Sequence, residues 1–81
     1  MLTVIYMVLE TMTDAVNLAN QCRVFKSWDI DVRSKNRRYV VDGKSIMGLS
    51  ILVGGGELEF TIRKDDDVVV VDELPDFEEG I

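Results

Sequence analysis

Residues 42–52 read DGKSIMGLSIL, a polar turn that runs directly into apolar residues at helical spacing. Ile46, Leu49 and Leu52 recur at every third position, which places them along one face of a short helix. Ser45 stands directly before the first of them, where a serine hydroxyl accepts hydrogen bonds from the free N–H groups of the first helical turn. These residues therefore predict a short helix with Ser45 as its N-cap.

Strand patterns flank this helix on both sides. The glycines at 54–56 end it, and residues 57–63, ELEFTIR, then alternate between polar and apolar side chains as a half-buried strand does. Upstream, residues 29–33 show the same alternation, and residues 39–41 form a second short run with strand character. A polar turn at residues 34–38 joins these two runs, so the pair predicts a β-hairpin.

The N-terminal part of the chain predicts one further strand and one further helix. Residues 3–8 are rich in β-branched and apolar side chains over the length of a strand. Thr13 or Asp14 then caps a helix over residues 15–25, in which apolar side chains recur with the helical period. The resulting order β-α-β-β-α-β predicts an α+β fold with two layers, in which the helices cover one face of an antiparallel sheet.

The 81 residues carry a formal net charge of −6, which is distributed unevenly. Residues 1–64 contain nine bases and seven acids, whereas residues 65–81 contain eight acids and no base. We therefore divide the chain into a folded domain at 1–64 and an acidic C-terminal segment at 65–81. Within that segment, the valines at 68–71 favour extended structure and Pro75 disfavours a long helix, so we expect a short helix or an extended stretch.

A resemblance to a known family lies at residues 44–48. The run Lys-Ser-Ile-Met-Gly closely resembles the regulatory-serine signature of HPr, the histidine-containing phosphocarrier family of the bacterial sugar phosphotransferase system. The resemblance extends without gaps from the first predicted strand to about Arg63. It implies an HPr-like sandwich of order β-α-β-β-α-β(-α), with a four-stranded antiparallel sheet in the order 1-4-2-3 and a third helix at the C-terminus.

The catalytic signature of that family is absent from this chain. The family's active-site histidine falls on Asp14, the arginine and proline that follow it fall on Val16 and Asn17, and the sequence contains no histidine. The carboxylate of Asp14 would repel an incoming phosphoryl group, and Val16 supplies no cation. We therefore expect no enzymatic or phosphocarrier activity and no cofactor, with Asp14 acting as a helix cap.

Ser45 is the candidate functional residue. The resemblance implies its phosphorylation by an HPr kinase/phosphorylase-like kinase, followed by binding of a LacI-type catabolite repressor. Lys44, Ile46 and Met47 would surround the phosphate as partner contacts, since a phosphate adds charge and acceptor oxygens that a partner's arginines can bind. The predicted function is that of a cytoplasmic HPr-like regulatory protein in carbon catabolite regulation. Helix capping by Ser45 is compatible with this role.

Two alternatives from other classes stay open. A divergent phosphotransferase-system component could dock the sugar-transport enzymes without carrying phosphate. An oligomeric interaction module could instead use the valine-rich tail, because an extended stretch at 68–71 can add to a sheet edge of its own or another molecule, and pairing with another copy would form a homodimer. Phosphorylation of Ser45 would separate the regulatory hypothesis from both alternatives.

The composition argues against several other classes of site. The single Cys22 excludes an intramolecular disulfide, and the lack of histidine and of further cysteines suggests no zinc site. Residues 54–56 follow a helix, the reverse of a phosphate-binding P-loop, and residues 65–67 lack the spacing of a calcium loop. The overall acidity opposes nucleic-acid binding despite the bases at 33–38, and no apolar run is long enough to cross a membrane.

Overall fold

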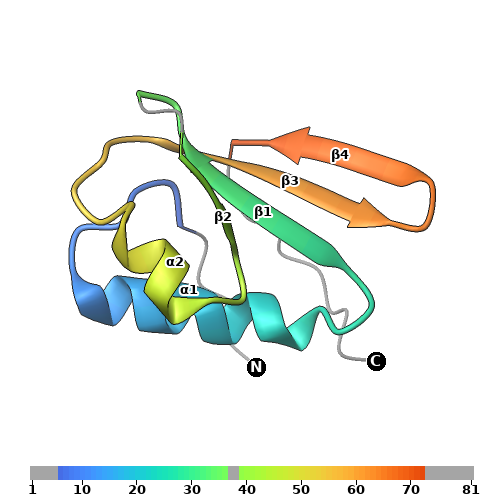
Figure 1. Cartoon of the computed structure of the whole chain (residues 1–81), viewed down its shortest axis with the longest axis horizontal. Helices are drawn as coiled ribbons and strands as arrows, with labels where there is room; N and C mark the ends of the chain where they lie inside the picture. The colour runs from blue at the N-terminus through green and yellow to red at the C-terminus, as the bar shows by residue number, and fades with distance from the viewer. Residues whose placement is uncertain (1–5, 37–38, 73–81) are drawn as a thin grey trace.

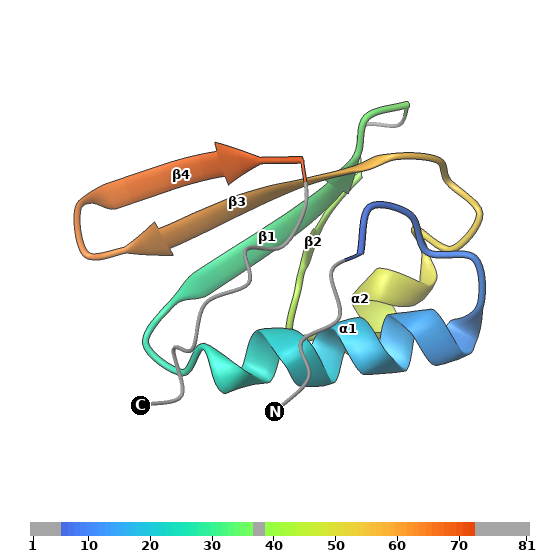
Figure 2. The same cartoon turned by 180° about the vertical axis from the view of Figure 1, so that it is seen from behind.

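The computed structural model describes residues 6–36 and 39–72, which form an α+β domain. Its helices lie on one side of a four-stranded sheet (Figure 1, Figure 2). In chain order the elements are α1 (Met12–Val24), β1 (Asp29–Ser34), β2 (Val40–Asp42), α2 (Ile46–Ser50), β3 (Leu58–Lys64) and β4 (Asp67–Val71).

The strands form one antiparallel sheet in the order β2-β1-β3-β4. β1 and β3 occupy its centre, where Ile30 lies opposite Ile62 and Val32 lies opposite Phe60. Opposite residues of an antiparallel pair project to the same face, so these four side chains form one apolar surface. That surface faces the helices and is the buried face of the two central strands.

The hydrophobic core lies between the helices and the central strands. Alternate residues of β1 and β3 are buried there, as the polar and apolar alternation of both segments predicts. The fully buried apolar side chains, each at most 2% exposed, are Leu9, Ala15, Leu18, Ala19, Cys22, Phe25, Ile30, Val32, Leu49, Leu52, Leu58, Phe60 and Ile62. The strands predicted at residues 29–33, 39–41 and 57–63 are confirmed as β1, β2 and β3.

The start of α1 differs from the prediction. Thr11, rather than Thr13 or Asp14, is the N-cap, and its hydroxyl accepts a hydrogen bond from the Asp14 N–H at 3.2 Å. The Asp14 carboxylate in turn accepts from the backbone N–H groups of Glu10 and Thr11, at 3.0 and 3.2 Å. This reciprocal capping box places the carboxylate three residues after the cap. Asp14 therefore stabilises α1 from inside its first turn.

The predicted HPr-like arrangement is wrong. The elements follow the order α-β-β-α-β-β with the sheet order 2-1-3-4, not β-α-β-β-α-β with the sheet order 1-4-2-3. The segment expected to form the N-terminal edge strand makes only an isolated bridge within the described residues, between Val8 and Glu57. Beside this bridge the Leu58 N–H donates to the Met7 carbonyl at 2.8 Å. Residues 6–8, the described part of this segment, therefore pair with the chain only at the start of β3.

β4 occupies most of that edge instead. It pairs antiparallel with residues 60–64 of β3 through a two-residue loop. An N-terminal strand would have to close a loop of roughly fifty residues to reach the same place, which costs more conformational entropy than closing a tight hairpin. The valine run at 68–71 also has the high β-propensity that a partner strand needs. The expected strand residues 3–5 and any helix within 73–81 lie outside the described residues.

Among residues 6–36 and 39–72, Ser34 is the one polar residue that is fully buried. Its hydroxyl donates to the Gly55 carbonyl at 2.6 Å and accepts from the Asn36 N–H at 3.3 Å. These bonds join the end of β1 to the glycine loop that precedes β3. Because a buried hydroxyl is tolerated only when it is hydrogen-bonded, this position depends on both partners.

We predict that Ser34→Ala lowers the free energy of unfolding by about 1–3 kcal/mol, because the Gly55 carbonyl loses its buried donor. Urea unfolding followed by circular dichroism measures this difference. Ser50→Ala is the matched control, since the Ser50 hydroxyl donates to the Met47 carbonyl on the exposed side of α2. Equal losses of stability in the two variants would contradict the prediction.

Candidate functional site

Ser45 is the N-cap of α2, which confirms the predicted capping role. Its hydroxyl oxygen accepts a hydrogen bond from the Gly48 N–H at 3.1 Å, and the residue is half-buried. α2 is five residues long and ends at Ser50. The hydroxyl therefore caps a short helix that packs against α1, and Figure 2 shows the two helices together below the strands.

Lys44 supports the C-terminal end of α1. Its ammonium group donates to the carbonyl oxygens of Phe25 and Trp28, at 2.8 and 2.7 Å, just beyond the last turn of that helix. Arg23, within the last turn, donates to the Lys44 carbonyl at 3.2 Å. Carbonyl groups at a helix C-terminus lack partners inside the helix, and a cation there also interacts favourably with the helix dipole. Lys44 thus ties the turn before α2 to α1.

Ile46 and Met47 differ in their surroundings. Ile46 is half-buried and packs against the core, whereas Met47 is 83% exposed. Of these four residues only Met47 is exposed: Ser45 is half-buried, Lys44 binds carbonyl groups beyond the end of α1, and Ile46 packs against the core. Phosphorylation of Ser45 and partner binding through its three neighbours stay predictions.

We predict that Lys44→Met lowers the free energy of unfolding by about 1.5–3 kcal/mol, because the carbonyls of Phe25 and Trp28 lose a charged donor. Lys26→Met is the matched control, since Lys26 is exposed and its ammonium group makes no hydrogen bond within the described chain. Urea unfolding of both variants and the parent measures the effect. If the Lys44 variant is as stable as the Lys26 variant, the stabilising role assigned to the Lys44 ammonium group is wrong.

β4 is exposed over most of its surface. Val68, Val69 and Val70 are 57%, 47% and 56% exposed. Val69 lies opposite the core residue Ile62, so it projects to the helix side of the sheet, whereas Val68 and Val70 project to the open face. Figure 1 shows β4 at the edge of the sheet farthest from α2. β4 is thus an apolar edge strand that the helices leave uncovered.

The backbone groups of β3 point alternately to its two neighbours. The Glu57 carbonyl accepts from the Lys35 N–H at 2.9 Å on the β1 side, whereas the Leu58 N–H donates to Met7 on the opposite side. Along an antiparallel strand, successive residues direct their N–H and C=O groups to alternate sides. The backbone groups of Leu58 and of every second residue after it therefore point toward the edge at which β4 lies.

The same alternation leaves part of β4 unpaired. Val69 lies opposite Ile62 and Val71 lies opposite Phe60, so these two valines exchange backbone hydrogen bonds with β3. The N–H and C=O groups of Val68 and Val70 then point away from β3. β4 is the last strand of the sheet, and no strand among residues 6–36 and 39–72 pairs with its outer edge. Within the described chain, the outer edge of β4 thus presents the backbone N–H and C=O groups of Val68 and Val70 next to exposed valine side chains.

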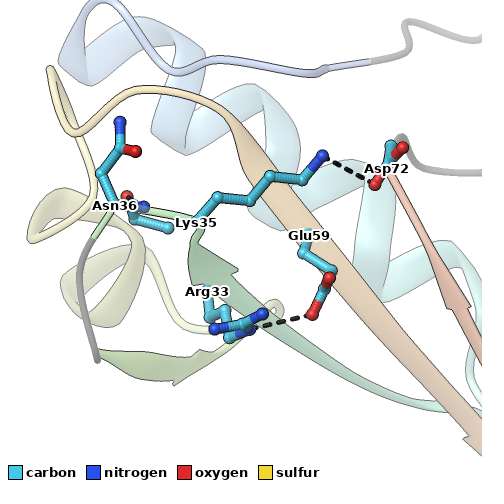
Figure 3. A network of polar contacts seen from close by, with 6 residues as sticks. Arg33, Lys35, Asn36, Glu59 and Asp72 are labelled. Carbon is cyan, nitrogen blue, oxygen red and sulfur yellow. Dashed lines mark hydrogen bonds and ion pairs between the residues drawn. The ribbon is translucent and has the colours of Figure 1, made fainter.

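An ion-pair network fixes the C-terminal end of β4 (Figure 3). Lys35 binds Asp72, directly after β4, at 2.8 Å and Glu57 at 3.6 Å. Arg33 and Glu59 form a neighbouring pair at 2.8 Å between β1 and β3. The hydrogen bond to Asp72 raises the pKa of the Lys35 ammonium group above its ordinary value. The stabilisation is therefore complete below the ordinary lysine pKa, and it is lost as the pH rises through the raised folded value.

The N-terminal end of β4 carries three consecutive aspartates. Asp65, Asp66 and Asp67 are exposed, and none of them takes part in an ion pair between described residues. The adjacent Lys64 ammonium lies over the Trp28 ring, 5.2 Å from its centroid, as in a cation–π contact. Lys64 also lies opposite Asp67 in the hairpin, and at the other end of the strand Asp72 is followed by four further acids and no base in the sequence.

The sequence left open that the 68–71 stretch adds to a sheet edge of its own molecule, and it also carries a signal for the particular pairing of β4 with β3. The valines at 68–71 follow the strand pattern at 57–63 after a short acidic stretch, and strands separated in this way often form a hairpin. Asp65 and Asp66 form the loop, and Asp65 adopts a left-handed φ of 56°. Aspartate is among the residues that tolerate this conformation, so the acidic stretch suits the turn.

Other described residues offer packing rather than reactive chemistry. Burial raises the pKa of the Cys22 thiol to about 12, although the nearby Lys44 opposes the shift, so the thiol stays protonated at neutral pH. No group of three or more metal-binding side chains occurs within residues 6–36 and 39–72. Within the same ranges, no helix has the length and apolar character needed to cross a membrane.

No protein-family model, curated protein or solved structure matches this chain. The resemblance of residues 44–48 to the HPr family therefore stays a prediction. The functional inference below therefore depends on the geometry of β3 and β4.

We predict that the amide hydrogens of Val68 and Val70 exchange with solvent roughly tenfold faster than those of Val69 and Val71, because only the latter pair is bonded to β3. Hydrogen exchange followed by 15N NMR measures all four rates in one sample. Val69 and Val71 are the internal control, since they belong to the same strand as Val68 and Val70 and are exposed by the same local unfolding of the hairpin. Equal protection along the strand would contradict the assigned hydrogen-bond direction.

Proposed function

We propose that this chain is a non-enzymatic interaction module that binds an extended segment of another protein as an additional strand beside β4. The observation that supports this most directly is the outward direction of the Val68 and Val70 backbone groups on an uncovered apolar edge. Strand addition uses main-chain hydrogen bonds for affinity and alternate side chains for selectivity. The β4 edge offers both.

The added strand would meet valines on both faces of the sheet. Its residues beside Val68 and Val70 would pack on the open face, and those beside Val69 would pack on the helix side. β-branched and aromatic side chains make the most favourable cross-strand pairs, so they suit these positions. β4 has only five residues, and the small contact implies a weak, reversible complex.

The opposite edge of the sheet, formed by β2, is less suited to strand addition than β4. β2 has three residues, of which Val40 is 59% exposed. The chain turns away directly after β2, where the Gly43 N–H donates to the Ile30 carbonyl and the Lys44 N–H donates to the Asp42 carboxylate. A strand this short offers fewer main-chain groups than β4, and short edges are a common protection against pairing.

Regulation through Ser45 stays a separate prediction. Its support was the resemblance at residues 44–48, and the strand order implied by that resemblance differs from the order in this chain. The function proposed here therefore includes neither the HPr kinase/phosphorylase-like kinase and LacI-type repressor nor docking to sugar-transport enzymes. It depends only on the geometry of β3 and β4.

We predict that Val70→Pro weakens strand addition without unfolding the domain. Proline removes the N–H that points outward from this position, and the ladder with β3 does not use that group. The probe is the capped peptide Thr-Val-Thr-Val-Thr, titrated against the 15N-labelled chain while the shifts of Val68 and Val69 are followed. We expect the dissociation constant to rise at least roughly tenfold, because a main-chain bond is lost and the partner carbonyl is left without a donor.

Two variants control this experiment. Val70→Thr keeps both the N–H and the β-branched shape, so it should bind the peptide as the parent does. Val69→Pro removes an N–H that bonds to β3, so it should destabilise the hairpin. If millimolar peptide causes no shift changes along β4 of the parent chain, the proposed function is wrong.

A further inference from the structure

The buried face of the sheet continues into β4 through a cross-strand row of apolar side chains. In this row Ile30 of β1 lies opposite Ile62 of β3, and Ile62 lies opposite Val69 of β4. The exposed fraction rises along the row from 1% for Ile30 and 2% for Ile62 to 47% for Val69. The row therefore ends at an apolar side chain that is nearly half exposed.

This rise in exposure follows from the position of the helices. They cover the central strands and leave β4 uncovered at the edge of the sheet (Figure 1, Figure 2). Val71, the next residue of β4 on the helix side, is half-buried and packs against the core. A strand added beside β4 would extend the row by one residue and cover the exposed part of Val69. The helix side of the added strand is therefore where apolar surface can be buried.

The open face of the sheet beside β4 is polar. Val68 lies opposite Arg63, and Val70 lies opposite Thr61. The Arg63 guanidinium group pairs on this face with the Asp31 carboxylate of β1. A partner side chain on the open face would stay in contact with water and with these polar groups, so an apolar residue there buries little surface. Polar residues suit the open face of the added strand as well as apolar ones do.

The hydrogen-bond pattern also favours the position beside Val69. Every strand pair of this sheet is antiparallel, and antiparallel ladders are slightly the more stable kind. In such a ladder the partner residues opposite Val68 and Val70 form hydrogen-bonded pairs, whereas the residue opposite Val69 forms a non-hydrogen-bonded pair. The Cα atoms are about 4.5 Å apart in the second kind and about 5.5 Å apart in the first, so side chains come closest at Val69. An aromatic ring at this position also reaches the diagonal neighbour Val71.

We infer that the strand bound by β4 belongs to a different protein and carries an aromatic residue opposite Val69, between polar residues opposite Val68 and Val70. This inference rests on the proposed function and specifies the partner's chemistry. The aromatic ring extends the apolar row and covers Val69, while the main-chain groups of the flanking residues bond to Val68 and Val70. β4 therefore selects its partner mainly through one side-chain position.

A second copy of this chain does not supply this pattern. The two-fold antiparallel pairing that engages Val68 and Val70 of both copies is centred on Val69, so it places a valine where the aromatic residue is required. It also places Asp66 of each copy opposite Asp72 of the other, and like charges directly opposite each other destabilise strand pairing. Each copy carries a net charge of −6, which adds repulsion between the two molecules.

Two capped peptides that differ in one side chain test this requirement. They are Thr-Thr-Phe-Thr-Thr and Thr-Thr-Ala-Thr-Thr, and each reads the same in both directions, so the comparison does not depend on the orientation of the bound strand. Each is titrated against the 15N-labelled full chain while the shifts along β4 are followed. We expect the peptide with phenylalanine to bind at least roughly threefold tighter, because its ring buries apolar surface against Val69.

Two matched variants assign the difference to one face of β4. Val69→Ala truncates the side chain on the helix side, and Val70→Ala truncates its neighbour on the open face. Both variants keep the backbone N–H, and each is titrated with both peptides, so a general weakening of strand addition cancels from the comparison. We expect Val69→Ala to remove most of the preference for phenylalanine, and Val70→Ala to leave it within roughly twofold of the parent value. Hydrogen exchange of the Val71 amide verifies that the hairpin is intact.

The outcomes separate this inference from the function on which it rests. If the two peptides bind the parent chain equally well, strand addition stands and the aromatic requirement is overturned. Equal losses of the preference in the two variants, or a larger loss in Val70→Ala, would overturn the assignment to the helix side. If both of these peptides and Thr-Val-Thr-Val-Thr fail to bind a monomeric chain, the proposed function itself is removed.

Two further measurements test other occupants of the same position. A concentration-dependent dimer in sedimentation velocity that excludes the peptides would make a second copy the occupant and overturn the inference. The sequence after β4 contains one aromatic residue, Phe77. If Phe77→Ala strengthens the binding of Thr-Thr-Phe-Thr-Thr, the chain's own aromatic residue competes for the position beside Val69, and the inference of a different protein is wrong. Unchanged binding by this variant supports it.

Discussion

Backbone hydrogen bonding on both sides of β3 organises this molecule. On one side, β3 pairs along its length with β1, and on the other it pairs with β4 and, through a single bridge at Val8, with the N-terminal segment. Its alternate side chains Leu58, Phe60 and Ile62 are buried against the helices. Because β3 is buried on one face and paired at both edges, its side chains and its backbone both fix the position of neighbouring elements.

The exposed edge of the sheet results from the way in which the backbone groups of β3 find hydrogen-bond partners. Because β4 pairs with β3 and the helices do not cover β4, the sheet ends, among residues 6–36 and 39–72, in a strand with exposed apolar side chains and outward-pointing backbone groups. Such an edge promotes aggregation unless charge or shape protects it. Here acidic residues stand at both ends of the valine run, at 65–67 and at Asp72, and they oppose the pairing of like copies.

The residues around Ser45 show how a short motif can have a structural role. Lys44 binds the carbonyls beyond α1, Ser45 caps α2 and Ile46 packs on the core. Each of these interactions explains its residue type without a ligand, since caps and helix-end cations are common stabilising devices. Met47, which is exposed, has no such explanation. A five-residue match therefore says less about function than the position of each side chain in the fold.

The sequence by itself determined the local elements of this protein. Alternation predicted β1 and β3, the position of Ser45 predicted its cap, and the valines at 68–71 indicated extended structure, because each of these signals depends on neighbouring residues alone. Only the tertiary structure decided which of two strand-forming segments takes the free edge of β3. Both segments have the required propensity, and the choice depends on loop-closure entropy and on packing between residues far apart in the chain. The candidate site follows from that choice, since the direction of the backbone groups of Val68 and Val70 exists only once β4 is paired.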